Sequence, residues 1–328
     1  MGMTSNGEAD ASLNAGKQSV NGRGESIDVS YSKAMAGSNS FDMTFNKPLL
    51  GWQRYENVGF SVGNPFQHLT WNSADLSETF ATFYYNRRFF NNKLGYNVQM
   101  NASWRKFIPT EDSPFPIRDQ AGHTMKLSFE ESYTIDSRDR PILASKGILA
   151  KYCHEYAGIL GDAVFFKNQL DLQASAPFIF GSTLSASIKG LHINSFGNSK
   201  LHLLDSAYLG GPYDVRGFEM KSIGTRADHA CLGGATAVAA TFHLYRPLIP
   251  ADSLFLHAFM SCGSVARVGS KTRIQDLLDV PRVSTGIGIA FLFRNAVRLE
   301  FNYVLPIRYV PGDAFKTGFQ FGAGINFL

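Results

Sequence analysis

The chain has 328 residues and a formal net charge of +4, from 31 Lys and Arg against 27 Asp and Glu. Its basic residues form no run suited to nucleic acid, so no nucleic-acid partner is predicted. Aromatic residues make up 13% of the chain and charged residues only 18%, which favours strands that face an apolar medium. No stretch of about 18 consecutive apolar residues occurs, which excludes a helical membrane protein but not a membrane β-barrel.

Period-2 alternation of apolar and polar residues recurs along the chain. In chain order, about fifteen strand-like segments of about 8–13 residues are expected, the length of a tilted membrane strand. Their centres lie near residues 11, 29, 43, 59, 82, 100, 128, 152, 170, 187, 240, 258, 289, 301 and 323. In the segment 297–305, for example, apolar side chains alternate with Arg298, Glu300 and Asn302. Clusters of Gly, Asn, Asp and Ser separate the segments and predict turns.

The two faces of these segments differ in kind, one apolar and the other rich in charged and polar residues. In lipid every backbone donor and acceptor must be paired within the protein, so a sheet must close on itself. Aromatic residues also gather at segment ends, as they do at membrane interfaces. The sequence therefore predicts an all-β fold, a transmembrane antiparallel β-barrel of about 15–16 strands with a polar lumen.

Between Ile193 and Ala235 the chain shows no alternation of apolar and polar residues, which predicts a long loop. Loops of that length are usually functional. This interval contains the run LGGPYDVRGF from Leu209 to Phe218. An arginine at position 216 could bond two groups of a barrel wall in a fixed geometry. The alternative is a solvent-exposed loop arginine, because most loops run over the surface. The candidate loop residues are Gly210, Gly211, Pro212, Val215, Arg216, Gly217 and Phe218.

This loop resembles the sixth loop of the outer-membrane assembly factor superfamily, most of all that of the barrel subunit of the mitochondrial sorting and assembly machinery. Residues 136–139 (DSRD), 243–248 (HLYRPL) and 320–328 (QFGAGINFL) add to the resemblance. It spans nearly the whole chain and is densest after residue 205. It implies about sixteen strands and a loop folded into the lumen, with its arginine against polar or acidic wall groups. It also implies a lateral seam where precursor strands add to the sheet edge.

The chain departs from the family pattern in three places. Residues 1–20 are expected to be a degraded N-terminal strand region before a bacterial-surface-antigen-type transmembrane β-barrel domain over 21–328, without an N-terminal POTRA domain. The fifteen expected segments include no counterpart of the first strand of the family's barrel. Where bacterial relatives carry an aspartate facing the loop arginine, this chain has Ser261, which cannot neutralise Arg216. Glu300 is the suggested replacement.

The last segment carries a second pattern, Gln320-x-Gly322-x-x-Ile325-x-Phe327. It resembles the sorting signal of mitochondrial barrel precursors, and these four residues are the candidate gate-strand residues. The alternative is an ordinary lipid-facing strand, because period 2 by itself yields the two apolar positions.

The resemblance implies assembly and insertion of unfolded β-barrel precursor proteins into the mitochondrial outer membrane by a multi-pass protein. The expected partners are these precursors, the other subunits of the assembly complex and outer-membrane lipid. Neither the three cysteines nor the eight histidines form a metal pattern, and no catalytic residue, metal or cofactor is predicted. The alternatives are a porin-like channel, an inactive truncated paralogue acting as a scaffold, or an incomplete gene sequence of a longer factor.

Overall fold

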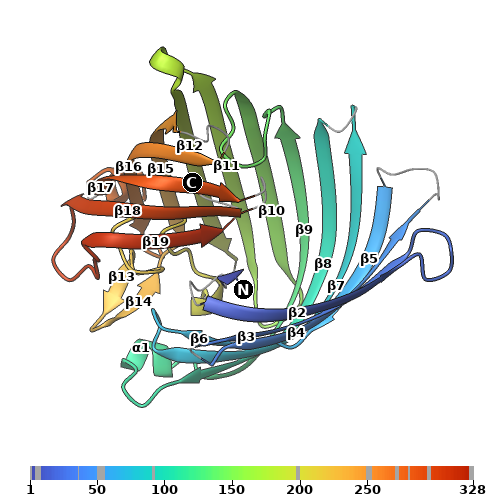
Figure 1. Cartoon of the computed structure of the whole chain (residues 1–328). Coiled ribbons are helices and arrows are strands. Elements are labelled where there is room, and N and C mark those ends of the chain that lie inside the picture. The colour runs from blue at the N-terminus through green and yellow to red at the C-terminus, as the bar shows by residue number, and fades with distance from the viewer. Residues whose placement is uncertain are drawn as a thin grey trace. The chain divides into compact units, whose positions relative to one another are not determined.

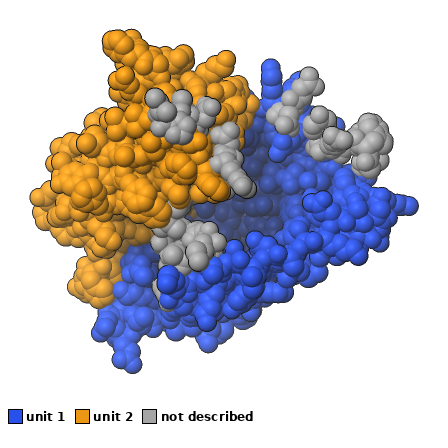
Figure 2. Space-filling model, in the orientation of Figure 1, with its two compact units in different colours: residues 1–135, 152–168, 194–205 blue, residues 136–151, 169–193, 206–328 orange. Residues whose placement is uncertain are grey.

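Antiparallel strands dominate the computed structural model (Figure 1). The structure describes residues 2–3, 9–35, 37–49, 56–90, 93–196, 200–248, 253–269, 273–279, 281–293 and 297–324. The chain divides into two units, shown in blue and orange in Figure 2. Unit 1 comprises residues 1–135, 152–168 and 194–205, and unit 2 comprises residues 136–151, 169–193 and 206–328. Strands β10 (Gly147–Gly161), β11 (Phe165–Pro177) and β12 (Thr183–Ser195) contribute residues to both.

Unit 1 is built on an antiparallel meander in which strands that follow one another in the chain pair with one another. Its strands are β1 (Gly2–Met3), β2 (Ala9–Gln18), β3 (Ser26–Ala34), β4 (Asn39–Pro48), β5 (Glu56–Gly63), β6 (Phe66–Leu69), β7 (Ala74–Phe89), β8 (Leu94–Pro109) and β9 (Gly122–Asp136). Both β5 and β6 pair with β7. The unit also contains the short helix α1 (Phe115–Arg118) and the 3₁₀ turn η2 (Leu203–Asp205). Residues 10–18, within the expected N-terminal strand region, pair with β3.

Unit 2 continues the same pattern from β12 onward. Its further elements are η1 (Ile179–Gly181), β13 (Thr225–Ala227), β14 (Ala230–Gly233), β15 (Thr236–Pro247), β16 (Leu254–Ala266), α2 (Arg273–Asp279), β17 (Arg282–Phe293), β18 (Val297–Arg308) and β19 (Gly318–Gly324). Each of β12, β15, β16, β17 and β18 pairs with the next strand in that order, ending on β19. β13 and β14 form a separate hairpin within the long loop between β12 and β15.

The strand faces of unit 2 are inverted relative to those of a water-soluble sheet. On β18, Phe301 and Tyr303 are 60% and 43% exposed, whereas Glu300 and Asn302 are 0% and 3% exposed. Exposed apolar rows and buried polar rows suit an apolar solvent outside the sheet. The predicted alternation on this strand is confirmed. In unit 2, however, part of the polar face is packed against the long loop and is not open to water.

Each of the fifteen expected segments coincides with a strand among the residues that the structure describes. The four further strands there, β1, β6, β13 and β14, have only two to four residues, which is too short for a period-2 pattern to be recognised. Within the described ranges, no helix has the length and apolar composition needed to cross a bilayer.

Candidate functional site

The motif residues of the long loop lie inside unit 2. Val215, Arg216 and Phe218 are at most 2% exposed, and Pro212 is half-buried. Gly210 and Gly211 have φ of 114° and 112°, a conformation that glycine adopts without steric cost. A Cβ on Gly210 would lie 2.6 Å from the Glu219 carbonyl oxygen. The two glycines therefore let the chain fold back tightly and carry the arginine inward.

Arg216 faces the carboxylate of Glu300 on β18. Its Nε and Nη2 atoms both lie 3.3 Å from Oε2, and both side chains are 0% exposed. The guanidinium also lies over the ring of Phe259, 4.9 Å from the ring centroid, within the range of a cation–π interaction. The suggested pairing of Arg216 with Glu300 is present, and the alternative of a solvent-exposed arginine is wrong.

Glu300 is shared with a second cation from its own strand. Arg298 forms an ion pair with it and also donates to the Tyr245 hydroxyl at 2.7 Å. Asn302 donates its amide to Glu300 Oε2 at 2.8 Å, and its oxygen lies 2.7 Å from Nε2 of His257. Because that oxygen can only accept, the His257 Nε2 carries the hydrogen. One buried carboxylate thus holds two guanidinium groups, and further hydrogen bonds fix its position.

Ser261 occupies the position where an acid was expected from the family pattern. It lies on β16, is fully buried, and accepts a hydrogen bond from Thr241 Oγ1 at 3.3 Å. The acid that receives the loop arginine therefore lies on β18, two strands further along the sheet.

The residues after Arg216 pair with the loop between β18 and β19. Phe218 and Phe315 form an antiparallel bridge. The Lys316 amide donates to the Gly217 carbonyl at 2.9 Å, and the Glu219 amide donates to the Ala314 carbonyl at 3.0 Å. The loop is therefore held by main-chain hydrogen bonds of the kind that add a strand to a sheet edge.

A buried ion pair fixes the segment that receives the loop. Arg282 on β17 donates from Nε and Nη2 to the two oxygens of Asp313, at 3.0 and 3.1 Å. Asp313 also accepts from the Val310 amide at 2.8 Å. Two parallel bonds between guanidinium and carboxylate fix orientation as well as distance, so this ion pair holds the β18–β19 loop, on which Gly217 and Phe218 pack.

Two of the four candidate gate-strand residues lie next to the loop or its ion pair. Gln320 on β19 accepts from the Gly217 amide at 3.2 Å and donates to the Lys316 carbonyl at 2.9 Å. Gly322 is the Cα partner of Glu300 in the β18–β19 pairing. Ile325 and Phe327 lie outside the described residues. Gln320 thus joins the last strand to the loop main chain, a contact that its place in a sorting-signal pattern did not predict.

Replacing Gly217 with alanine is expected to lower the free energy of unfolding by about 1–3 kcal/mol. Gly217 has φ 85°, and a Cβ there would lie 3.0 Å from Val304 Cγ1 and 3.4 Å from Ser284 Cβ. Urea unfolding in detergent micelles measures the loss. Gly312→Ala is the matched control, because its φ is 94° but no atom lies within 4 Å of its Cβ position. Equal losses for the two variants would show that packing against Val304 is unimportant.

The beginning of the long loop belongs to unit 1 and is held by a different ionic cluster. Asp205 accepts two hydrogen bonds from Arg105 of β8, at 2.8 and 3.0 Å, and lies 3.6 Å from Lys126 Nζ of β9. Lys126 also pairs with Glu155 of β10 at 2.6 Å. All four side chains are at least four-fifths buried. Burial would raise the pKa of Asp205, but the charges of Arg105 and Lys126 outweigh it and hold that pKa below 3.8.

Sequence reasoning missed this cluster and the Arg282–Asp313 pair. Arg105 and Asp205 are 100 residues apart, and each looks like an ordinary polar residue of a strand or loop. The one available signal was that charged residues are few, so those on the inward face of a strand must find partners or line water. Among the described residues no group of three or more His, Cys, Asp or Glu side chains is placed to hold a metal ion.

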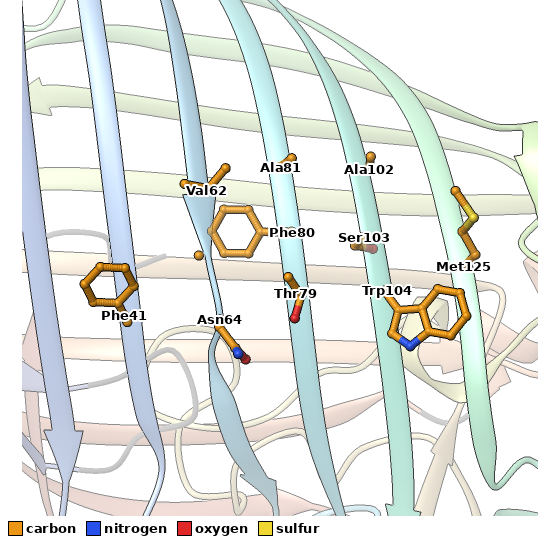
Figure 3. Close-up of a pocket in the computed structure, with 11 residues that line it drawn as sticks. Phe41, Val62, Asn64, Thr79, Phe80, Ala81, Ala102, Ser103, Trp104 and Met125 are labelled. Atoms are coloured by element: carbon orange, nitrogen blue, oxygen red, sulfur yellow. The ribbon is translucent and has the colours of Figure 1, made fainter.

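Unit 1 contains a shallow cavity of about 450 Å³ (Figure 3). Val62, Ala81 and Ala102 lie opposite one another on β5, β7 and β8, with the larger Phe41 and Trp104 at its sides. None of the residues that line it is charged, so it offers no acid, base or ion-binding group.

A family model and curated proteins match nearly the whole chain. An Omp85 superfamily domain matches residues 20–327. The chain is 33% identical to the sorting and assembly machinery component 50 homolog of Homo sapiens, covering 99% of this chain and 71% of that protein. It is 24% identical to a SAM50-like protein of Drosophila melanogaster, covering 94% of this chain and 70% of that one.

Solved structures show the same fold. BamA from Haemophilus ducreyi lacking POTRA domains 1–3 matches with a TM-score of 0.83 and 16% identity, covering 96% of this chain and 66% of that chain. CdiB from Acinetobacter baumannii matches with a TM-score of 0.60 and 14% identity, covering 98% and 57%. The predicted fold class, a transmembrane antiparallel β-barrel with a long loop folded inside, is confirmed, and the chain is an outer-membrane protein.

Proposed function

Because the chain belongs to the Omp85 superfamily, we propose that it assembles β-barrel precursor proteins and inserts them into the mitochondrial outer membrane. Its partners are unfolded precursors, the lipid of that membrane and further subunits of a sorting and assembly machinery. Mitochondrial placement is supported by the 33% identity to a human protein of that machinery. The protein acts without a catalytic residue or a cofactor, since strand pairing and lipid transfer drive insertion.

The main support for this proposal is the set of contacts that holds the Arg216 loop inside unit 2. Arg216 is paired with Glu300 of β18, and the two residues after it are bonded to Gln320 of β19 and to the β18–β19 loop. A simple pore needs no such connection between an inner loop and its last strand. We propose that the seated loop holds β19 in position while a precursor strand adds to it by main-chain hydrogen bonds.

We also propose that residues 21–328 act as the membrane domain. Gly210, Gly211, Pro212, Val215, Arg216, Gly217 and Phe218 hold the loop inside it, and Gln320, Gly322, Ile325 and Phe327 form the strand that precursors meet. The support for these roles is the burial of the loop motif and the bonds of Gln320.

Arg216→Ala is expected to reduce precursor assembly severely, because it removes the cation that holds the loop on Glu300. The purified protein is reconstituted in liposomes with an unfolded β-barrel precursor, and folded precursor is measured by its heat-shifted migration in gels. Arg246→Ala is the matched control, since Arg246 is an exposed arginine of β15 in the same unit. The folded state of each variant is verified by its own heat-shifted migration.

Full precursor assembly by folded Arg216→Ala protein would contradict the role of the loop. Two outcomes with the unaltered protein would contradict the proposed function itself. One is ion conductance through the liposomes without precursor assembly, which would identify a porin-like channel. The other is a normal level of other outer-membrane barrels in cells depleted of the protein.

A further inference from the structure

The tip of the β11–β12 hairpin presents three consecutive large apolar side chains outside its strands. Phe178, Ile179 and Phe180 are 49%, 60% and 86% exposed. From Leu172 to Ile188 the chain carries no charged residue. By contrast, the β9–β10 turn of the same unit contains Arg138, Asp139, Arg140 and Lys146. Exposed apolar side chains that lie next to one another without a charge mark a surface that contacts an apolar partner or a membrane.

The apolar surface of the tip is continuous with the lipid-facing row of its strands. Leu172 on β11 and Leu184 on β12 are exposed on the outer face. On the opposite face Ser175 and Ser185 are buried and hydrogen-bonded to each other at 3.0 Å. Following the outer row to the end of the hairpin leads directly onto the three tip residues, with no polar girdle between them.

Part of the tip backbone is hydrogen-bonded within the turn. The Phe178 amide donates to the Ser182 carbonyl at 2.7 Å, and the Ser182 amide donates back to the Ile179 carbonyl at 3.2 Å. The Ser182 hydroxyl also donates to the Ile179 carbonyl, at 2.5 Å. Polar groups paired within the turn can enter the membrane interface without losing hydrogen bonds to water.

Phe180 is also held outward by a backbone conformation that aromatic residues seldom adopt. Its φ and ψ are 55° and 33°, the left-handed region, and Gly181 follows with φ 69°. Such a conformation is strained for a bulky residue, and strained residues cluster at functional sites. Here it accompanies the most exposed side chain of the tip, that of Phe180, which is 86% exposed.

We propose that this tip is a bilayer anchor, with Phe178, Ile179 and Phe180 immersed in the interfacial layer of the membrane beyond the ends of β11 and β12. Aromatic and aliphatic side chains favour that layer. Because the hairpin carries no charge from 172 to 188, its binding needs no anionic headgroup and is independent of salt. The proposal depends on the fold and not on the assembly function.

The test places a fluorescent NBD group on the tip in lipid nanodiscs. Cysteine replaces Phe180 in protein whose Cys153, Cys231 and Cys262 have been changed to alanine. The control is Lys146→Cys, on the charged β9–β10 turn. Nanodiscs are prepared from zwitterionic lipid with and without anionic lipid, and with doxyl groups at two acyl depths. Heat-shifted migration verifies that each labelled protein is folded, and Ile179→Cys provides a second tip position.

NBD at the tip is expected to be quenched by the shallow doxyl lipid and to be several-fold less quenched by aqueous iodide than NBD at position 146. The result should be the same with and without anionic lipid and at low and high salt. Equal iodide quenching at the two positions, without doxyl quenching, would overturn the proposal. So would protection from iodide that appears only when another protein is added, because the tip would then be a protein-docking surface.

Discussion

Glu300→Ala is expected to lower the free energy of unfolding by about 3–5 kcal/mol, the usual cost of leaving buried charge uncompensated. Arg216 and Arg298 both depend on this carboxylate, and Arg216 and Glu300 are 0% exposed. Without the acid, hydration stabilises the Arg216 guanidinium more than its buried position does. The long loop should therefore leave the polar face of β18, and precursor assembly should be lost.

Urea unfolding in detergent micelles measures the stability change, and protease cleavage near residue 219 reports release of the loop. Glu219→Ala is the matched control, because Glu219 is an exposed acid of the same loop. Combining Arg216→Met with Glu300→Leu gives a double-mutant cycle. The double variant should be more stable than Glu300→Leu alone, since it leaves one buried cation where Glu300→Leu leaves two. If Glu300→Ala and Glu219→Ala were equally stable, Glu300 would not hold the loop.

Asp205→Ala is expected to have a similar effect on unit 1, again about 3–5 kcal/mol. It leaves Arg105, which is 5% exposed, without its two hydrogen bonds to a carboxylate. Asp205→Asn keeps the shape of the side chain and removes only its charge, so it should lose less stability than Asp205→Ala. In both variants Lys126 retains Glu155 as a partner. Asp112→Asn is the control, since Asp112 is an exposed acid between β8 and β9.

The same cluster predicts acid sensitivity. The pKa of Asp205 is lowered in the folded state, so the unfolded chain binds the proton first. The stability that Asp205 contributes is present above its ordinary pKa of 3.8 and is lost as the pH falls through the lowered value. Burial and Arg105 also lower the pKa of His202 from 6.5. This adds a loss of folding stability that begins at a higher pH, as the pH falls below 6.5.

Unfolding measured between pH 7 and pH 3 should therefore show one loss of stability below pH 6.5, from His202, and another below pH 3.8, from Asp205. In Asp205→Asn the loss below pH 3.8 should be reduced and the loss below pH 6.5 retained. An unchanged acid limb in Asp205→Asn would show that other carboxylates, and not Asp205, control acid stability.

Strand positions and strand faces could be predicted because they depend on neighbours in the chain. The alternation of Phe301 and Tyr303 with Glu300 and Asn302 is visible in one segment, and a strand turns successive side chains to opposite faces. Glu300 could be suggested as the partner of Arg216 because it is the acid on the inward face of the predicted strand 297–305. The pairing with the Ala314–Lys316 segment could not be foreseen, because it uses main-chain groups that every residue has.

By itself, the sequence determined the fold class, the inward and outward faces, and the loop that departs from the strand pattern. These features follow from short-range periodicity and from a motif within ten residues. Apart from the suggested pairing of Arg216 with Glu300, only the tertiary structure decided which charges meet. Arg105 joins Asp205, Arg282 joins Asp313, and two arginines share Glu300. Coulomb attraction has no preference for sequence neighbours, so the register of the strands and the path of the loop select these partners.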